Sequence, residues 1–200
     1  MMEIPRGLAL LYSEGNPLPI SFEYSFLAGG IDTFLKQSFG WDIYFPIPIP
    51  TLIMLAMFLI GYIILNRLPI GRYVYAVGGN EEAAILSGIR TRYIKMFVYV
   101  VSGFMAAVAG IIQTSRVTSG QPSSAMGFEL DAIAAVVLGG TSIAGGRGHI
   151  VGTLIGAVLL GVLSNALNMF GITPYTQKVV KGAVILIAVL IGVLRKTGKK

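Results

Sequence analysis

The stretch IPTLIMLAMFLIGYIIL, residues 49–65, decides the fold class, because it carries no charged side chain. A helix needs roughly 20 apolar residues to cross about 30 Å of hydrocarbon at 1.5 Å per residue, so a run like this one can span a bilayer. The whole chain agrees with this reading: 54% of its residues are hydrophobic and 12% are charged, against about 25% charged in soluble domains. The sequence therefore predicts an all-α integral membrane protein.

Further apolar runs follow the first one along the chain. The third run is the least regular, because its continuous apolar part, Ala132 to Leu138, is short and is followed by glycines. A half-helix that enters and leaves on one side is the alternative for this run. With it counted as a crossing, we predict about five transmembrane helices, at residues 49–65, 94–112, 128–144, 150–167 and 176–194.

The distribution of cations favours five crossings over four. Cytoplasmic loops carry the excess of Lys and Arg, and five crossings place ten of the fifteen cations on one side. If the third segment turned back, the basic tail would face away from the basic loop. We therefore predict an extracytoplasmic loop and chain start at 1–48, a transmembrane domain at 49–194 with a cytoplasmic loop at 66–93, and a basic cytoplasmic tail at 195–200.

A short charged segment lies inside the loop 66–93. Asn80 is a favourable N-cap, Glu81 and Glu82 suit the first turn of a helix, and Gly88 can take the left-handed conformation that ends one. The segment therefore predicts about two turns of helix between the first two crossings. The alternative is an amphipathic loop whose cations lie at the membrane interface.

Small residues recur at the spacing that lets membrane helices approach closely. Gly152 and Gly156 form a GxxxG pair, Ala157 and Gly161 repeat the four-residue spacing, and Gly103 with Ala107 repeats it on the second crossing. Lipid gives no hydrophobic drive for helix association, so close backbone packing has to supply it. These glycines predict a tightly packed bundle.

Polar side chains are few in and near the crossings. Ionisable groups in a membrane are costly and tend to face a cavity or a partner, so these residues are candidates for a translocation path or a polar core. The alternatives are that the carboxylates cap the third helix and that the lysine extends outward to the interface. The candidates are Glu129, Asp131, Asn165, Asn168 and Lys181.

Composition and motifs argue against several other functions. The chain has no cysteine and a single histidine, His149, so no thiolate or histidine-cluster metal site is expected. The net charge is +6, but the cations lie beside the apolar runs, where they orient helices in the membrane and do not indicate nucleic-acid binding. The glycine-rich stretch 139–148 lacks the Gly-Lys-Ser/Thr ending of a phosphate-binding loop. No catalytic residue and no cofactor are predicted.

Several stretches together resemble one transporter family. Glu82-Ala83-Ala84, followed by Gly88, looks like the "EAA" coupling motif of ABC importer permeases. The match extends over residues 71–84, 129–142, 145–148 and 151–156, and residues 6–11 resemble an earlier segment of that family. The chain resembles the ribose/galactose/xylose-type sugar permeases of the branched-chain amino acid/ribose permease superfamily.

The resemblance implies one half of a transmembrane dimer in a bacterial-type plasma membrane. Its partners would be cytoplasmic ABC ATPase subunits, an extracytoplasmic solute-binding protein, a second permease copy, a sugar substrate and membrane lipid. The helix in the charged segment would seat in a groove of the ATPase. By the resemblance, the coupling residues are Asn80, Glu81, Glu82, Ala83, Ala84 and Gly88.

The resemblance also leaves points open. Family members have further spans before the segment with which this chain begins, so we expect the C-terminal part of a permease fold, from a fragment, a misplaced start or a split gene. The solute could also be a branched-chain amino acid or a nucleoside. An ATP-independent channel or a non-transporting membrane fragment is the alternative from another class, and an intramembrane enzyme is the weakest.

Overall fold

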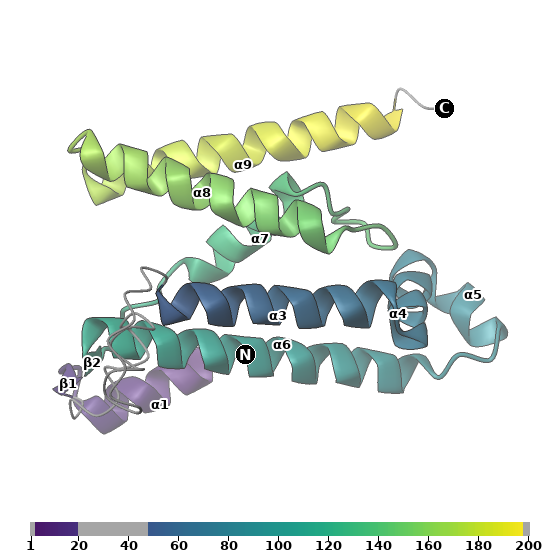
Figure 1. The fold of residues 1–200 in the computed structure, drawn as a ribbon, viewed down its shortest axis with the longest axis horizontal. Helices are drawn as coiled ribbons and strands as arrows, with labels where there is room; N and C mark the ends of the chain where they lie inside the picture. The colour runs from purple at the N-terminus through teal and green to yellow at the C-terminus, as the bar shows by residue number, and fades with distance from the viewer. Residues whose placement is uncertain (1–2, 20–47, 198–200) are drawn as a thin grey trace, which may run out of the picture. The chain divides into compact units, whose positions relative to one another are not determined.

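The structure is a computed structural model that describes residues 3–19 and 48–197, with only the backbone of residues 187–189 and 191–197. Its described part is almost wholly helical, which confirms the predicted all-α class (Figure 1). The helices are α1 (Glu3–Ser13), α3 (Ile49–Asn66), α4 (Pro69–Gly79), α5 (Glu81–Leu86), α6 (Thr91–Val117), α7 (Phe128–Leu138), α8 (Ile150–Met169) and α9 (Pro174–Thr197).

Three of the described helices are long and apolar enough to cross a membrane, namely α3, α6 and α8, with mean hydropathies of 2.1, 1.9 and 2.1. They correspond to the first, second and fourth predicted crossings. Helix α9, at 24 residues, has the length of a crossing at the fifth predicted position. The count of five crossings itself stays a prediction.

The third predicted crossing is shorter than its expected range of 128–144. Helix α7 has 11 residues, or about 16 Å at 1.5 Å per residue, roughly half of the hydrocarbon thickness. It ends at Leu138 because Gly140 takes a φ of +85° and the Thr141 amide turns back to the Val136 carbonyl at 3.1 Å. The glycines that made this run irregular in sequence are therefore what stops the helix.

The chain divides into two compact units. The first comprises Met1–Leu59 and Phe97–Met126. In it, β1 (Leu18–Pro19) pairs antiparallel with β2 (Ser119–Gly120). Residues 3–13, expected as loop, form α1, which has Glu3 in its first turn, where a carboxylate is favourable. The rest of the predicted extracytoplasmic loop, residues 20–47, lies outside the described residues.

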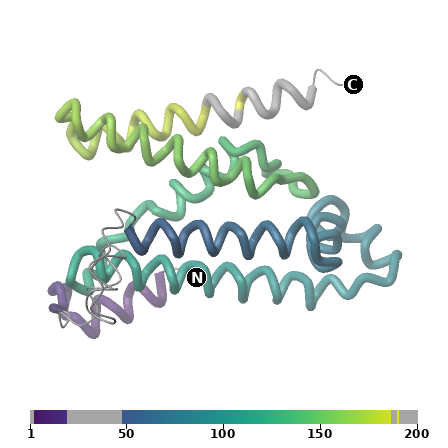
Figure 2. The backbone as a smooth tube through the Cα atoms, in the orientation of Figure 1, coloured from purple at the N-terminus to yellow at the C-terminus, as the bar shows by residue number. Residues whose placement is uncertain are grey.

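The second unit comprises Ile60–Met96 and Gly127–Lys200. Within it α7 packs against both α8 and α9, and α4 packs against α5. The chain runs through α7, α8 and α9 in succession (Figure 2). Its buried core is made of Ala134, Ala135 and Leu160, with larger, partly buried side chains such as Leu138 and Ile185 packed against it.

Candidate functional site

Asn80 lies between α4 and α5, as the C-cap of the first helix and the N-cap of the second. Asn80 is extended, with φ −156° and ψ 104°, so the two helices meet at one non-helical residue. Its backbone amide donates to the Ala76 carbonyl at 3.0 Å, and its side-chain Oδ1 accepts from the Ala83 amide at 3.0 Å. The predicted N-cap is therefore present.

The other end of α5 is closed by Gly88. Its φ of +79° is in the left-handed region that glycine enters without steric cost. The Gly88 amide donates to the Ile85 carbonyl at 2.9 Å, and the Ile89 amide donates to the Ala84 carbonyl at 3.0 Å. This pair of bonds is the Schellman arrangement. The short helix is thus defined by its own sequence at both ends, as predicted.

An ion pair ties the start of α5 to the start of α6. The Nζ of Lys95 donates to the Glu81 carboxylate at 2.6 Å, and both side chains are about half exposed. The hydrogen bond from Lys95 is the main reason that the pKa of Glu81 is lowered from its ordinary value. Lys95 therefore links the start of α5 to the beginning of the following helix.

The outer face of α5 is exposed and mixed in character. Ala84 is buried at 4% exposure, whereas Ile85 is 54% and Leu86 is 89% exposed. Glu82 is also exposed on this short helix. A capped helix that presents one carboxylate and two large apolar side chains has the composition of a small docking surface, because apolar anchors beside a charge suit a partner's groove.

The helix-packing glycines divide into two groups. Gly152 and Gly156 lie against α7: a Cβ at Gly152 would overlap the Gly139 carbonyl, and one at Gly156 would overlap the Ala135 carbonyl. Around Gly103 and Gly161 a Cβ would meet no described atom within 4 Å. For these two residues the packing role stays a prediction.

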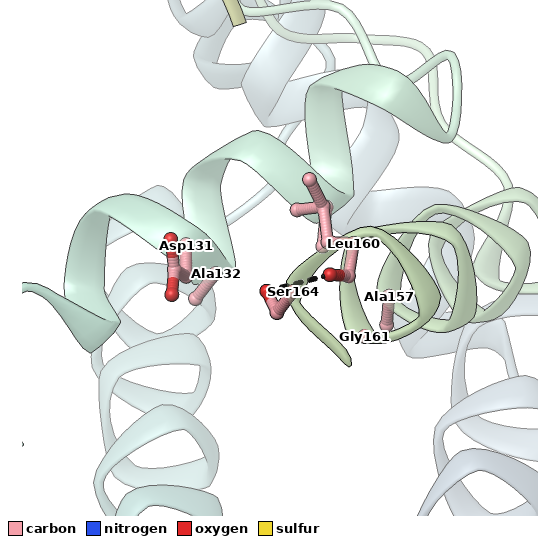
Figure 3. Close-up of a pocket in the computed structure, with 7 residues that line it drawn as sticks. Asp131, Ala132, Ala157, Leu160, Gly161 and Ser164 are labelled. Atoms are coloured by element: carbon pink, nitrogen blue, oxygen red, sulfur yellow. Dashed lines mark hydrogen bonds between the residues drawn. The ribbon is translucent and has the colours of Figure 1, made fainter. Parts of the chain in front are cut away.

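Asp131 and Lys181 are brought together across α7 and α9. The Nζ of Lys181 donates to Oδ2 of Asp131 at 2.8 Å, and the two side chains are 21% and 38% exposed. Asp131 also lines a hollow of about 280 Å³ between α7 and α8. Figure 3 shows Asp131 on one wall and Ser164 on the other, where the Ser164 hydroxyl donates to the Leu160 carbonyl at 2.8 Å.

The remaining polar candidates lie apart from this hollow's lining. Glu129 accepts from the Gly127 amide at 3.2 Å at the start of α7, which agrees with the capping alternative. Asn168, at the end of α8, accepts from the Gln177 side chain at 2.8 Å. Asn165 is exposed on α8. The described residues hold no cluster of three or more His, Cys, Asp or Glu side chains that could bind a metal.

One contact was not predicted from the sequence. The Oη of Tyr75, on α4, donates to the Gly148 carbonyl at 2.9 Å, 73 positions further along the chain. Near it, Gly78 and Gly79 of α4 lie directly against Gly145 and Gly146 of the α7–α8 loop. The sequence offered only the glycine pairs as a signal, and a glycine pair does not reveal its partner.

Comparison with known proteins places these features in a family. Residues 10–189 match the model of the family described as "Branched-chain amino acid transport system / permease component". The match covers most of the chain, including α5, α7 and α8. The chain belongs to this permease family. The predicted resemblance is therefore confirmed at the level of the family.

Named relatives of this permease are also similar over nearly the whole chain. It is 48% identical to the ribose import permease protein of Bacillus subtilis (strain 168) over 95% of its length and 56% of that protein. The ribose import permease of Escherichia coli (strain K12) is 48% identical over 96% of this chain and 57% of its own length. The L-arabinose transport system permease of the same strain is 40% identical over 100% and 57%.

The chain thus spans somewhat more than half the length of these relatives. No solved structure matches it significantly.

Proposed function

We propose that this chain forms the C-terminal part of the transmembrane permease subunit of an ABC sugar importer. The observation that carries the proposal is α5, a helix of six residues capped by Asn80 and Gly88, with Glu82, Ile85 and Leu86 exposed. A helix this short is marginal alone in water. Caps at both ends and the ion pair with α6 stabilise this helix, as is needed for an element that keeps its conformation when a partner binds it.

In the proposed mechanism α5 docks into a groove of a cytoplasmic ATPase subunit. Closure of the ATPase around ATP moves α5, and the helices joined to it follow. The permease supplies no chemistry of its own. It requires a rigid docking element and stiff connections to the flanking helices, because a flexible connection would absorb the displacement.

The proposed solute is a monosaccharide. The support is the 48% identity to ribose import permeases and the 40% identity to an L-arabinose permease. The second candidate is another small solute such as a branched-chain amino acid, which the family description mentions. The proposed assembly also includes a solute-binding protein outside and a second permease copy, with α5 and the C-terminus on the cytoplasmic side.

Single-cysteine crosslinking tests the docking of α5 directly, because residues 1–200 contain no cysteine and any cysteine in the rest of the full-length permease can be replaced by serine. In the full-length permease assembled with its ATPase, Leu86→Cys should crosslink to the ATPase subunit. Phe170→Cys is the matched control, since Phe170 is 81% exposed, close to the 89% of Leu86, but lies after α8. Crosslinking at both positions, or at neither, contradicts the proposed docking.

Transport measurements test the function itself. Proteoliposomes that contain the complex should take up ribose only with ATP and the binding protein, and Glu82→Ala should lower uptake without lowering the amount of inserted protein. Uptake without ATP would support the channel alternative instead. Competition with unlabelled arabinose, leucine and a nucleoside for labelled ribose distinguishes the sugar from the other solutes.

A further inference from the structure

The end of α4 lies on the α7–α8 loop through backbone contacts. A Cβ at Gly145 would overlap the Gly78 carbonyl oxygen, and a Cβ at Gly146 would lie 2.7 Å from the Gly79 Cα. No real Cβ is found so close to a backbone atom, so both loop positions require glycine while α4 stays where it is. We call these four glycines, Gly78, Gly79, Gly145 and Gly146, the glycine joint.

A hydrogen bond from the same helix supports the joint. Tyr75 lies about one turn before Gly78 on α4, and its Oη donates to the Gly148 carbonyl at 2.9 Å. The loop is therefore held at two places, by backbone contact at 145–146 and by the hydroxyl at 148. Rotation of α4 about either contact breaks the other, except about the line that joins them, so the two contacts together restrict its orientation.

The two helices that flank the loop, α7 and α8, are also in close contact with each other. A Cβ at Gly139, where α7 ends, would overlap the Gly152 carbonyl, near the start of α8. Gly156 lies as tightly against the Ala135 carbonyl of α7. At these glycines α7 and α8 have no room to move closer to each other, so a push of the loop toward one helix also displaces the other.

Helix α5 follows α4 directly in the chain. Only Asn80 separates α4 from α5, and its amide and side chain are both hydrogen-bonded, to Ala76 and Ala83. A movement of α5 can therefore reach other helices through two connections. One is the direct connection to α6, reinforced by the pair of Lys95 and Glu81. The other passes through α4 and the joint.

We infer that the glycine joint transmits the movement of α5 to the pair α7 and α8, so that Gly145 and Tyr75 are positioning residues for coupling. This inference rests on the proposed function, because it presumes that an ATPase moves α5. It adds that the movement reaches a pair of helices remote in sequence from the docking element. Asp131 and the hollow beside it are on that pair.

Two alanine substitutions separate contact from backbone strain. Gly145 and Gly140 lie in the same loop with φ of +81° and +85°, so alanine carries the same left-handed strain at either place. They differ in surroundings: the new methyl overlaps Gly78 at position 145 and meets no described atom within 4 Å at position 140. Gly145→Ala is the test and Gly140→Ala is its matched control.

The experiment measures ribose taken up per ATP hydrolysed, in proteoliposomes that hold the full permease, its ATPase and the binding protein. Gly145→Ala should lower this ratio by about tenfold relative to Gly140→Ala, the scale on which overpacking disfavours a close contact. The ratio is the informative quantity, because a loss of folded protein would lower uptake and hydrolysis together. Tyr75→Phe removes only the hydroxyl and should lower the ratio less, by about threefold.

The outcomes separate this inference from the function on which it rests. Equal ratios for Gly145→Ala and Gly140→Ala in a transporting complex overturn the joint only. If Gly145→Ala does not insert, the ratio for Tyr75→Phe decides, and a wild-type ratio overturns the joint. A wild-type complex that shows no ATP-driven uptake overturns the proposed function itself.

Discussion

The packing of α7 on α8 can be tested by alanine at two glycines of one helix. At Gly156 the added methyl would overlap the Ala135 carbonyl oxygen and would lie 3.0 Å from the Gly139 amide nitrogen. At Gly161, five residues further along α8, it would meet no described atom within 4 Å. The two substitutions are otherwise alike, since both glycines lie inside the same helix.

The comparison isolates the cost of the overlap. Replacing glycine by alanine inside a helix gains about 1 kcal/mol of helix propensity, and this gain is common to both variants. Gly156→Ala must in addition push α8 away from α7, and overpacking of this kind costs about 1–3 kcal/mol. We expect Gly156→Ala to be less stable than Gly161→Ala by about 1–3 kcal/mol.

Thermal unfolding of the purified protein in detergent measures the difference. In a chain of this size each kcal/mol corresponds to a shift of about 2–4 °C in Tm. Gly161→Ala should melt at or above the wild-type temperature, and Gly156→Ala at or below it and always below Gly161→Ala. Equal Tm values would refute the described contact between α7 and α8. Destabilisation by Gly161→Ala alone would show that the tight packing is at Gly161 and not at Gly156.

Three further predictions concern the caps and the ion pairs. Asn80→Ala should loosen α5 by about 1 kcal/mol, seen as faster amide exchange confined to that helix. Asp131→Asn and Lys181→Met should each destabilise the protein, and the double variant should lose less than their sum by about 1 kcal/mol, measured as a double-mutant cycle. Because Lys95 lowers the pKa of Glu81, their pair contributes stability that is fully present above the ordinary carboxyl pKa. That contribution should stay constant near neutral pH and disappear only as acid protonates Glu81, which a pH titration of its carboxyl carbon by NMR would follow.

The features that could be predicted from the sequence are those fixed by neighbours along the chain. Asn80 and Gly88 delimit α5 through contacts that span no more than five residues, so their identities were sufficient. Apolar run length likewise placed α3, α6 and α8. Local chemistry of this kind is independent of how the rest of the chain folds.

Contacts between distant segments could not be predicted in the same way. The pairing of Lys181 with Asp131 joins positions 50 residues apart. Taken alone, Asp131 was equally compatible with capping the third helix, and Lys181 with extending to the membrane interface. From the sequence, Gly145 and Gly146 indicated only a helix break, because a glycine does not identify the segment that packs against it. Helix α4 was not predicted, because proline in the first turn of a helix is also common in loops.

The contact between α4 and the α7–α8 loop bears on the membrane topology. Helix α6 starts just after α5 and has 27 residues, about 40 Å at 1.5 Å per residue, which is enough to cross a bilayer. Gly145 nevertheless lies against Gly78, in the helix that precedes α5. If α6 crosses, the chain has to return to the side of α5 before α8 begins. The residues between Val117 and Gly139 make that return, although only 11 of them form α7.

This reasoning predicts sidedness, which cysteine labelling in intact cells can measure because the chain has no cysteine of its own. Leu86→Cys and Ile143→Cys, at sites 89% and 70% exposed, should both be protected from a membrane-impermeant maleimide. Met126→Cys and Phe170→Cys, at sites 56% and 81% exposed, should both react. Labelling of Ile143→Cys together with protection of Leu86→Cys would refute the return. A half-helix that turned back would produce that result, and it would separate Gly145 from Gly78 by the thickness of the membrane.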